Sequence, residues 1–117
     1  MRDVKWVGNS LEQMQSFPKP ARRIVGQALN AAQSGFKHIA AKPLQGVSSG
    51  VLEIAARYDT NTYRAVYTVK VGENVYVLHA FQKKSVRGIR TPKKEIDLIK
   101  QRLKMAREME AENEGQN

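Results

Sequence analysis

The sequence has no cysteine and no long apolar run, and it contains only two histidines. Without cysteine the chain forms no disulfide and offers no thiolate as nucleophile or metal ligand, a composition that suits a reducing cytosol. No stretch approaches the about 18 consecutive apolar residues of a membrane-spanning helix, and the N-terminus has no apolar core of a secretory signal. We therefore expect a cytoplasmic protein that does not bind membranes.

Motifs that hold metals and nucleotides are also missing. The sequence has no His-Glu-x-x-His pair, no carboxylate cluster with metal-ligand spacing and no glycine-rich phosphate loop. We therefore expect no bound metal and no cofactor. Any chemistry on phosphate would depend on lysine, arginine, histidine and tyrosine.

Acidic residues are scarce outside the C-terminal end. Residues 1–106 hold 19 of the 20 lysines and arginines but only 7 of the 11 acids, a net charge of about +12 against +9 for the whole chain. Such a charge attracts a polyanion, nucleic acid above all, or an acidic protein. The alternative is a basic surface that only keeps the protein soluble.

The first half of the chain predicts one strand and helices. Residues 3–7 alternate as a strand does, and the stretch that starts at Ser10 has the capping-box pattern of a short helical turn. Residues 21–35 repeat apolar side chains at three- and four-residue spacing, which predicts a helix. Two prolines precede it, so this region forms either two antiparallel helices or one broken helix. Residues 36–49 are rich in proline, glycine and serine and predict a loop.

The second half predicts a meander and a closing helix. Residues 51–58, 62–71 and 75–81 have strand character and are separated by short turn sequences, which indicates three antiparallel strands. Thr91 is predicted to cap a helix whose apolar stripe ends at Ala106. The predicted fold class is α+β, with an N-terminal strand and two helices, then the meander and a C-terminal helix, and with the helices packed on one face of the sheet.

This order of elements gives one domain over residues 1–106. Residues 107–117 are acidic and polar, and we expect them to form a frayed tail.

Basic side chains concentrate where the predicted meander ends. The side chains of Arg57 and Arg64 project from the first two strands of the meander, and His79 lies on the third. Because adjacent strands lie about 4.8 Å apart, these side chains can line one groove and bind a phosphate. Further cations follow within a few residues, and Tyr63 adds an aromatic face on which a base can stack. These cations are Lys83, Lys84, Arg87, Arg90, Lys93 and Lys94.

Each of these residues also has a structural interpretation. His79 in an apolar strand is more often a hydrogen-bonded histidine than a catalyst. Tyr67 and Tyr76 suit core positions, and Lys93 and Lys94 suit a solvated helix start.

Three stretches carry a resemblance to a known family: YRAVY at 63–67, VYVLHAFQKKS at 75–85 and TPKKEIDLIKQRL at 91–103. They resemble the RelE/ParE superfamily of bacterial toxins, most closely its phage-related HigB-like branch. In that branch a Leu-His-x-Phe-x-Lys-Lys strand precedes a Thr-Pro-x-x-Glu helix. The resemblance covers most of residues 1–106 and implies a RelE-like fold.

The resemblance also implies a function, the toxin of a type II toxin–antitoxin pair. RelE-like members enter the ribosomal A site and cut mRNA without a metal. The ribose 2′-hydroxyl attacks the adjacent phosphate and leaves a 2′,3′-cyclic phosphate and a 5′-hydroxyl. On this resemblance the chain is an endoribonuclease that inhibits translation and growth. Its implied partners are mRNA, the ribosome, and a cognate antitoxin that joins an acidic segment to a helix-turn-helix DNA-binding domain.

Position by position, Arg64 matches the strand arginine that contacts the scissile phosphate, and Arg57 falls where RelE-like nucleases place another basic residue. Lys84 matches a further phosphate-stabilising cation, and Lys83 flanks it. The tyrosine that many RelE-like nucleases carry near the end of the chain is absent, because the corresponding stretch reads VRGIR. The general base is therefore open among His79, Lys83 and Tyr63.

Two alternatives come from other functional classes. ParE-like members share the fold but inhibit DNA gyrase, and they lack the basic residues that RelE-like members use to cleave RNA. A non-catalytic nucleic-acid-binding module would use the same positive surface without chemistry.

Overall fold

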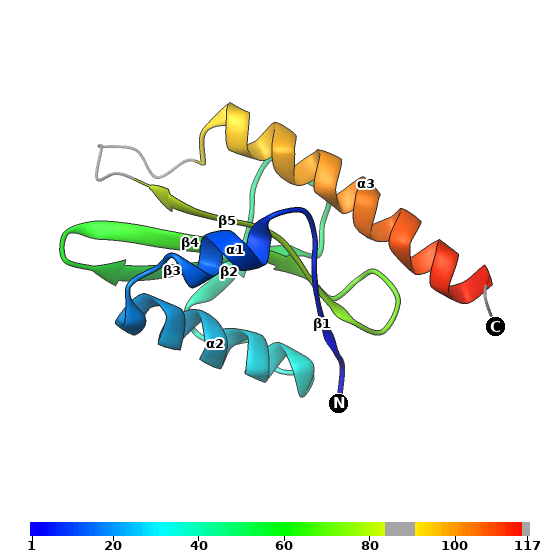
Figure 1. The fold of residues 1–117 in the computed structure, drawn as a ribbon, viewed down its shortest axis with the longest axis horizontal. Helices are drawn as coiled ribbons and strands as arrows, with labels where there is room; N and C mark the ends of the chain where they lie inside the picture. The colour runs from blue at the N-terminus through cyan, green and yellow to red at the C-terminus, as the bar shows by residue number, and fades with distance from the viewer. Residues whose placement is uncertain (84–90, 116–117) are drawn as a thin grey trace.

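The computed structural model describes residues 1–83 and 91–115, and Figure 1 shows its fold. The elements run β1 (Val4–Trp6), α1 (Ser10–Gln15), α2 (Lys19–Gln33), β2 (Ala41–Pro43), β3 (Val51–Tyr58), β4 (Asn61–Thr68), β5 (Val75–Lys83) and α3 (Lys93–Gly115). The strands form one sheet in the order β1-β5-β4-β3-β2. Strand β1 pairs with β5 in parallel, and the other pairs are antiparallel.

The predicted α+β class and the three-stranded meander are confirmed by β3, β4 and β5. The turn between β3 and β4 is tight, since Asp59 and Thr60 have φ values of 52° and 64°, the left-handed values that two-residue hairpin turns require. The sheet has one strand more than predicted. Strand β2 forms within the stretch that the sequence predicts as a loop, where Ala41 pairs with Ile54 of β3.

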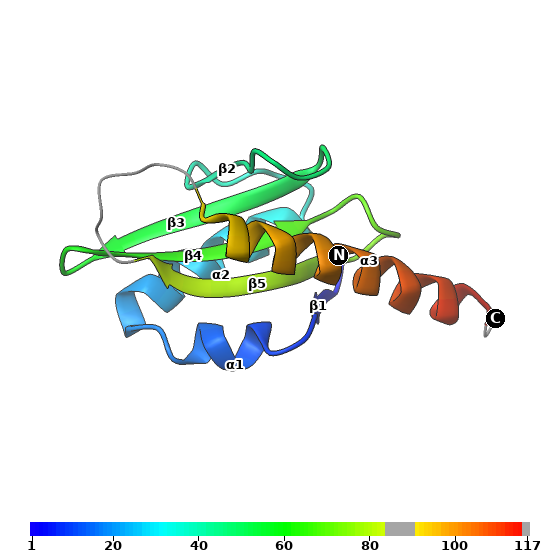
Figure 2. The same cartoon turned by 90° about the horizontal axis from the view of Figure 1, so that it is seen from above.

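Helices cover both faces of the sheet, so the prediction that they pack on one face is wrong. One core cluster joins α2 residues such as Val25 and Leu29 to Ile54 and Tyr67 of the sheet. A second cluster joins Ile99 and its neighbours on α3 to the opposite face. Figures 1 and 2 show α3 and α2 on opposite sides of the strands. The physical reason lies in β5, where every residue from Val75 to Ala80 is buried, so neither face of that strand can be left to solvent.

The first helical region forms two separate helices, α1 and α2, as one of the two alternatives predicted. The predicted capping box is wrong. Asn9 occupies the N-cap position of α1 without a side-chain cap, and Ser10 is the first helical residue. The Ser10 hydroxyl is buried and donates to the carbonyl oxygen of Val77 at 3.1 Å. It therefore joins α1 to β5.

Helix α3 continues to Gly115, so residues 107–115 are helical rather than a frayed tail. The Tyr76 hydroxyl on β5 donates to Glu110 Oε1 at 2.9 Å. Beyond Ala106 the helix therefore still contacts the sheet. Within residues 1–83 and 91–115, no helix is both long enough and apolar enough to cross a membrane.

Candidate functional site

The register of β3, β4 and β5 places nine side chains in three rows on the face that α3 covers. Residues paired directly across antiparallel strands point to the same face, and successive rows on that face lie two residues apart. We call this set the α3-facing grid. Its rows are Arg57–Thr62–Lys83, Ala55–Arg64–Phe81 and Glu53–Val66–His79.

The grid brings together four of the predicted site residues: Arg57, Arg64, His79 and Lys83. Arg57 is exposed and Lys83 is half-buried, so the first row is open to solvent. The third row is buried, since His79 is 6% exposed. The predicted residues Lys84, Arg87 and Arg90 lie outside the described residues.

A β-bulge in β5 determines which side chains enter the grid. Val66 pairs with His79 and the next residue, Tyr67, pairs with Val77, so Leu78 is an extra residue on β5. Strict alternation would place Leu78 and His79 on opposite faces. The bulge lets both face α3, because a bulge changes the direction of the side chains that follow it.

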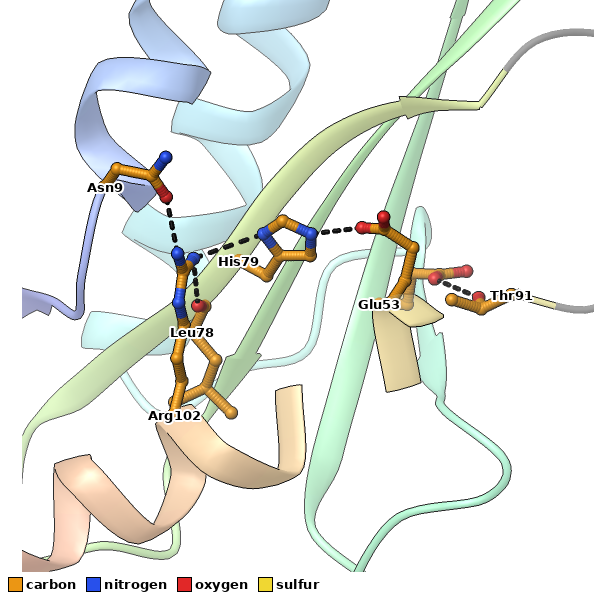
Figure 3. A network of polar contacts seen from close by, with 7 residues as sticks. Asn9, Glu53, Leu78, His79, Thr91 and Arg102 are labelled. Atoms are coloured by element: carbon orange, nitrogen blue, oxygen red, sulfur yellow. Dashed lines mark hydrogen bonds and ion pairs between the residues drawn. The ribbon is translucent and has the colours of Figure 1, made fainter. Parts of the chain in front are cut away.

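Arg64 forms an ion pair with Glu53, a residue that the sequence interpretation did not select. Glu53 Oε1 accepts from Arg64 Nη1, and the two side chains are 14% and 10% exposed. The Thr91 hydroxyl donates to the other oxygen, Oε2, at 2.8 Å (Figure 3). Thr91 therefore does not cap α3 as predicted, because its hydroxyl binds a buried carboxylate and the helix begins at Lys93. The signal in the sequence was a single acid in the apolar strand VLEIAARY, on the same face as Arg57.

His79 is held on both ring nitrogens. Nε2 pairs with Glu95 Oε2. Nδ1 lies 3.2 Å from Arg102 Nη1, a contact that Figure 3 draws between the labelled residues. Arginine has no acceptor, so Nδ1 accepts and the proton of the neutral ring lies on Nε2. Burial lowers the pKa of His79, the adjacent Arg102 lowers it further, and Glu95 opposes both. His79 is thus a neutral link between β5 and α3, as its structural interpretation expects.

Arg102 is the buried centre of this link, with 8% of its surface exposed. Its guanidinium donates to the carbonyl oxygen of Leu78 at 3.1 Å and to Asn9 Oδ1 at 2.6 Å, besides its contact with His79 (Figure 3). A side chain at Gly8 would collide with it, because a Cβ there would lie 2.8 Å from Arg102 Nε. The sequence interpretation did not select Arg102.

Lys83 lies near the Arg64–Glu53 pair. Its pKa is lowered by burial first and by the positive charge of Arg64 second, while Glu53 acts in the opposite direction. A lysine in this setting gives up its proton more readily than one in water.

The aromatic prediction was wrong. Tyr63 is 8% exposed and lies on the α2 face, where its ring packs against Phe17 with centroids 5.0 Å apart. In this position its ring can neither stack on a nucleobase next to Arg64 nor act as the general base for a phosphate bound to Arg64. Tyr67 and Tyr76 are core residues, at 1% and 0% exposed.

Lys93 and Lys94 lie at the start of α3 and are exposed. Lys93 pairs with Asp97 one turn later at 3.1 Å, with 89% of its side chain exposed. This arrangement is that of a solvated helix start, the structural interpretation of the two lysines.

The part of the chain that the structure describes contains no group of three or more histidine and acidic side chains that could hold a metal ion.

A family model described as Phage derived protein Gp49-like (DUF891) matches residues 12–104, which include the whole α3-facing grid, Glu95 and Arg102. No curated protein and no solved structure shows a significant match. The chain therefore belongs to the phage-derived Gp49-like family, a RelE/toxin-like family.

Proposed function

We propose that the chain is the toxin of a type II toxin–antitoxin pair and that it cleaves mRNA without a metal. The observation that carries this proposal is the α3-facing grid, in which Arg57, Arg64 and Lys83 come from three adjacent strands and face the same side. Glu53, paired with Arg64, is the one acid of the grid, so the three cations leave it with a net positive charge that attracts a further anion. A phosphate of single-stranded RNA supplies that anion, and guanidinium groups bind it in a bidentate manner.

In the proposed reaction, the ribose 2′-hydroxyl attacks the adjacent phosphate, and the products are a 2′,3′-cyclic phosphate and a 5′-hydroxyl. Arg64 stabilises the negative charge that develops on the phosphate oxygens. Lys83, with its lowered pKa, donates a proton to the leaving 5′-oxygen. Arg57, exposed in the first row, holds a neighbouring phosphate of the same strand. His79 positions the start of α3 rather than taking part in proton transfer.

The proposed partners follow from charge. Residues 1–106 carry a net charge of about +12, so an antitoxin with an acidic segment is the matching inhibitor. mRNA, free or on the ribosome, is the proposed substrate.

The test is controlled expression in a bacterium with three readouts taken within minutes: incorporation of a labelled amino acid, incorporation of labelled thymidine, and primer extension on abundant messages. The proposal expects amino-acid incorporation to stop first and new 5′-hydroxyl ends to appear. Arg64→Ala should lower cleavage by about 10²–10³-fold, the usual cost of one such donor. The matched controls are Arg22→Ala and Arg23→Ala, exposed arginines of α2 on the opposite side of the sheet, and both should remain toxic.

Arg64→Ala removes the arginine partner of Glu53, so its thermal unfolding is compared with that of Arg64→Lys, which keeps the charge. Undiminished cleavage by a folded Arg64→Ala protein would remove Arg64 from the mechanism.

One observation favours a second candidate, a protein without nuclease activity. Arg64 is paired with Glu53, and an arginine used only to neutralise a buried acid has a structural role. A gyrase inhibitor would stop thymidine incorporation first and leave messages intact. A non-catalytic nucleic-acid-binding module would leave both incorporations unchanged.

A further inference from the structure

Glu53 occupies the position in the α3-facing grid where a proton acceptor could serve the proposed cleavage. It lies on β3, one row below Arg64, and its side chain is 10% exposed. Its two oxygens have different partners, since Arg64 binds Oε1 and the Thr91 hydroxyl donates to Oε2 at 2.8 Å. One oxygen is thus held by a cation, and the other already accepts a hydrogen bond from an alcohol.

We propose that Glu53 is the general base of the cleavage reaction and that the Thr91 hydroxyl stands where the attacking ribose 2′-hydroxyl binds. This inference rests on the proposed function. It departs from what the family resemblance implies, because there the candidate bases were histidine, lysine and tyrosine.

The other candidates on this face are less suited to the role. Both ring nitrogens of His79 are engaged, and Tyr63 lies on the opposite face. A lysine ordinarily loses its proton only at about pH 10.4, so it is protonated at neutral pH. Lys83 is therefore better suited to donate a proton than to accept one. Glu95 is the other nearby acid, and its partner is His79 rather than the arginine that would hold the phosphate. Glu53 alone among the described residues of this face combines a carboxyl group, an alcohol donor and Arg64.

The step balances without any co-reactant. The proton of the 2′-hydroxyl passes to Glu53 Oε2 while the 2′-oxygen forms a bond to phosphorus. The bond between phosphorus and the 5′-oxygen breaks, and that oxygen takes a proton from the Lys83 ammonium group. Glu53 then loses its proton and Lys83 regains one through solvent, so the enzyme returns to its starting state.

The geometry has a consequence for Thr91. The ribose hydroxyl can reach Oε2 only when the Thr91 hydroxyl leaves it, so the Thr91 side chain must turn away as substrate binds. Thr91 is therefore a competitor of the substrate, and its removal should help cleavage rather than harm it.

The test compares single-turnover cleavage by purified full-length variants, on a free RNA and on ribosomes carrying message. Glu53→Gln should cut about 10²–10⁴-fold more slowly, the range for loss of a general base. Thr91→Ala should cut at least as fast as the unchanged protein. Thr91→Ser keeps the hydroxyl, so it should cut at the same rate as the unchanged protein. A substrate with a 2′-deoxy sugar at the cleavage position should bind to Glu53→Gln as tightly as to the unchanged protein or more tightly, because a negative charge near the phosphate is gone.

A merely structural Glu53 gives the opposite pattern. Glu53→Gln would then cleave within a few-fold of the unchanged protein, or would lose binding and cleavage together, and Thr91→Ala would lower the rate. Either result overturns the inference while cleavage by the unchanged protein still supports the proposed function. If Glu53→Gln does not fold, Glu53→Ala replaces it, and a folded Glu53→Ala with an undiminished rate overturns the inference, because it has no carboxylate at this position. No cleavage by the unchanged protein on either substrate overturns both proposals.

Discussion

Arg102 Nη1 lies 3.2 Å from His79 Nδ1, and this contact fixes the proton of the imidazole on the opposite nitrogen, beside Glu95. The two residues come from α3 and β5, 23 positions apart in the sequence. Protonation of His79 would place a second N–H against the guanidinium, so the folded protein resists it. The link between helix and sheet is therefore tied to the neutral form of one histidine.

The first prediction concerns pH. Burial lowers the pKa of His79 in the folded state, while an unfolded histidine takes up its proton near pH 6.5. Below that pH the unfolded state binds more protons, so stability is fully present above about pH 6.5 and falls as the pH drops. His79→Gln keeps one donor and one acceptor but cannot titrate. Between pH 6.5 and 5, the free energy of unfolding should fall less steeply in His79→Gln, by at most about 1.4 kcal/mol per pH unit.

Urea denaturation at a series of pH values measures this difference. His38→Gln, at the only other histidine, is the matched control for the loss of one imidazole. Equal slopes for His79→Gln and the unchanged protein would show that His79 is not held neutral.

The second prediction contrasts two glycines. Gly8 has a φ of 59°, and a Cβ there would lie 2.8 Å from Arg102 Nε. Gly8→Ala should therefore lower the free energy of unfolding by more than about 1 kcal/mol, since alanine is strained at this φ and displaces the guanidinium. Gly26 lies inside α2, and nothing lies within 4 Å of a Cβ placed there. Gly26→Ala should raise stability by about 1 kcal/mol, the helix preference of alanine over glycine.

Urea denaturation of both variants gives the signs directly. A Gly8→Ala protein as stable as the unchanged protein would mean that neither the backbone at Gly8 nor its contact with Arg102 requires glycine.

The third prediction tests the acidic end of α3. Burial and the neighbouring Glu110 raise the pKa of Tyr76, so its hydroxyl keeps the proton that it donates to Glu110. Tyr76→Phe removes this hydrogen bond to a charged acceptor, which should cost about 1.5 kcal/mol of stability. It should also speed hydrogen exchange of the amides after Ala106. Glu112→Gln, an exposed residue of the same turns, is the control and should change neither. Unaltered exchange in Tyr76→Phe would mean that the end of the helix is not held by this contact.

The sequence predicted the local elements well, because short turns and apolar spacing act within a few residues. Strands β3, β4 and β5 and helix α2 were predicted close to their observed bounds. Strand β2 has only three residues, and it exists because Ala41–Pro43 can pair with β3, which is a long-range contact. The two-sided packing was missed for a similar reason, since the continuous apolar run in β5 shows burial but not which elements cover it.

The candidate site was predicted in part. Spacing was sufficient to place Arg57 and Arg64 on one face, because they lie on strands joined by a short turn. The positions of His79 and Lys83 on that face depend on the bulge at Leu78, which simple alternation does not reveal. Glu53, Glu95 and Arg102 are unremarkable charged residues in the sequence. Their pairing with Arg64 and His79 depends on how α3 crosses the sheet.

Helix α3 gives the molecule an uneven distribution of charge. The helix begins beside the strands that carry the α3-facing grid and runs along the longest dimension, 47 Å, toward the opposite end (Figure 1). Glu108, Glu110, Glu112 and Glu114 all lie within its last eight residues. The protein is therefore an electric dipole as well as a net cation. In the field of a polyanion it experiences a torque that turns the end with β3, β4 and the start of α3 toward the anion and the glutamates away. On the proposed function, RNA would therefore meet the α3-facing grid before any other part of the protein.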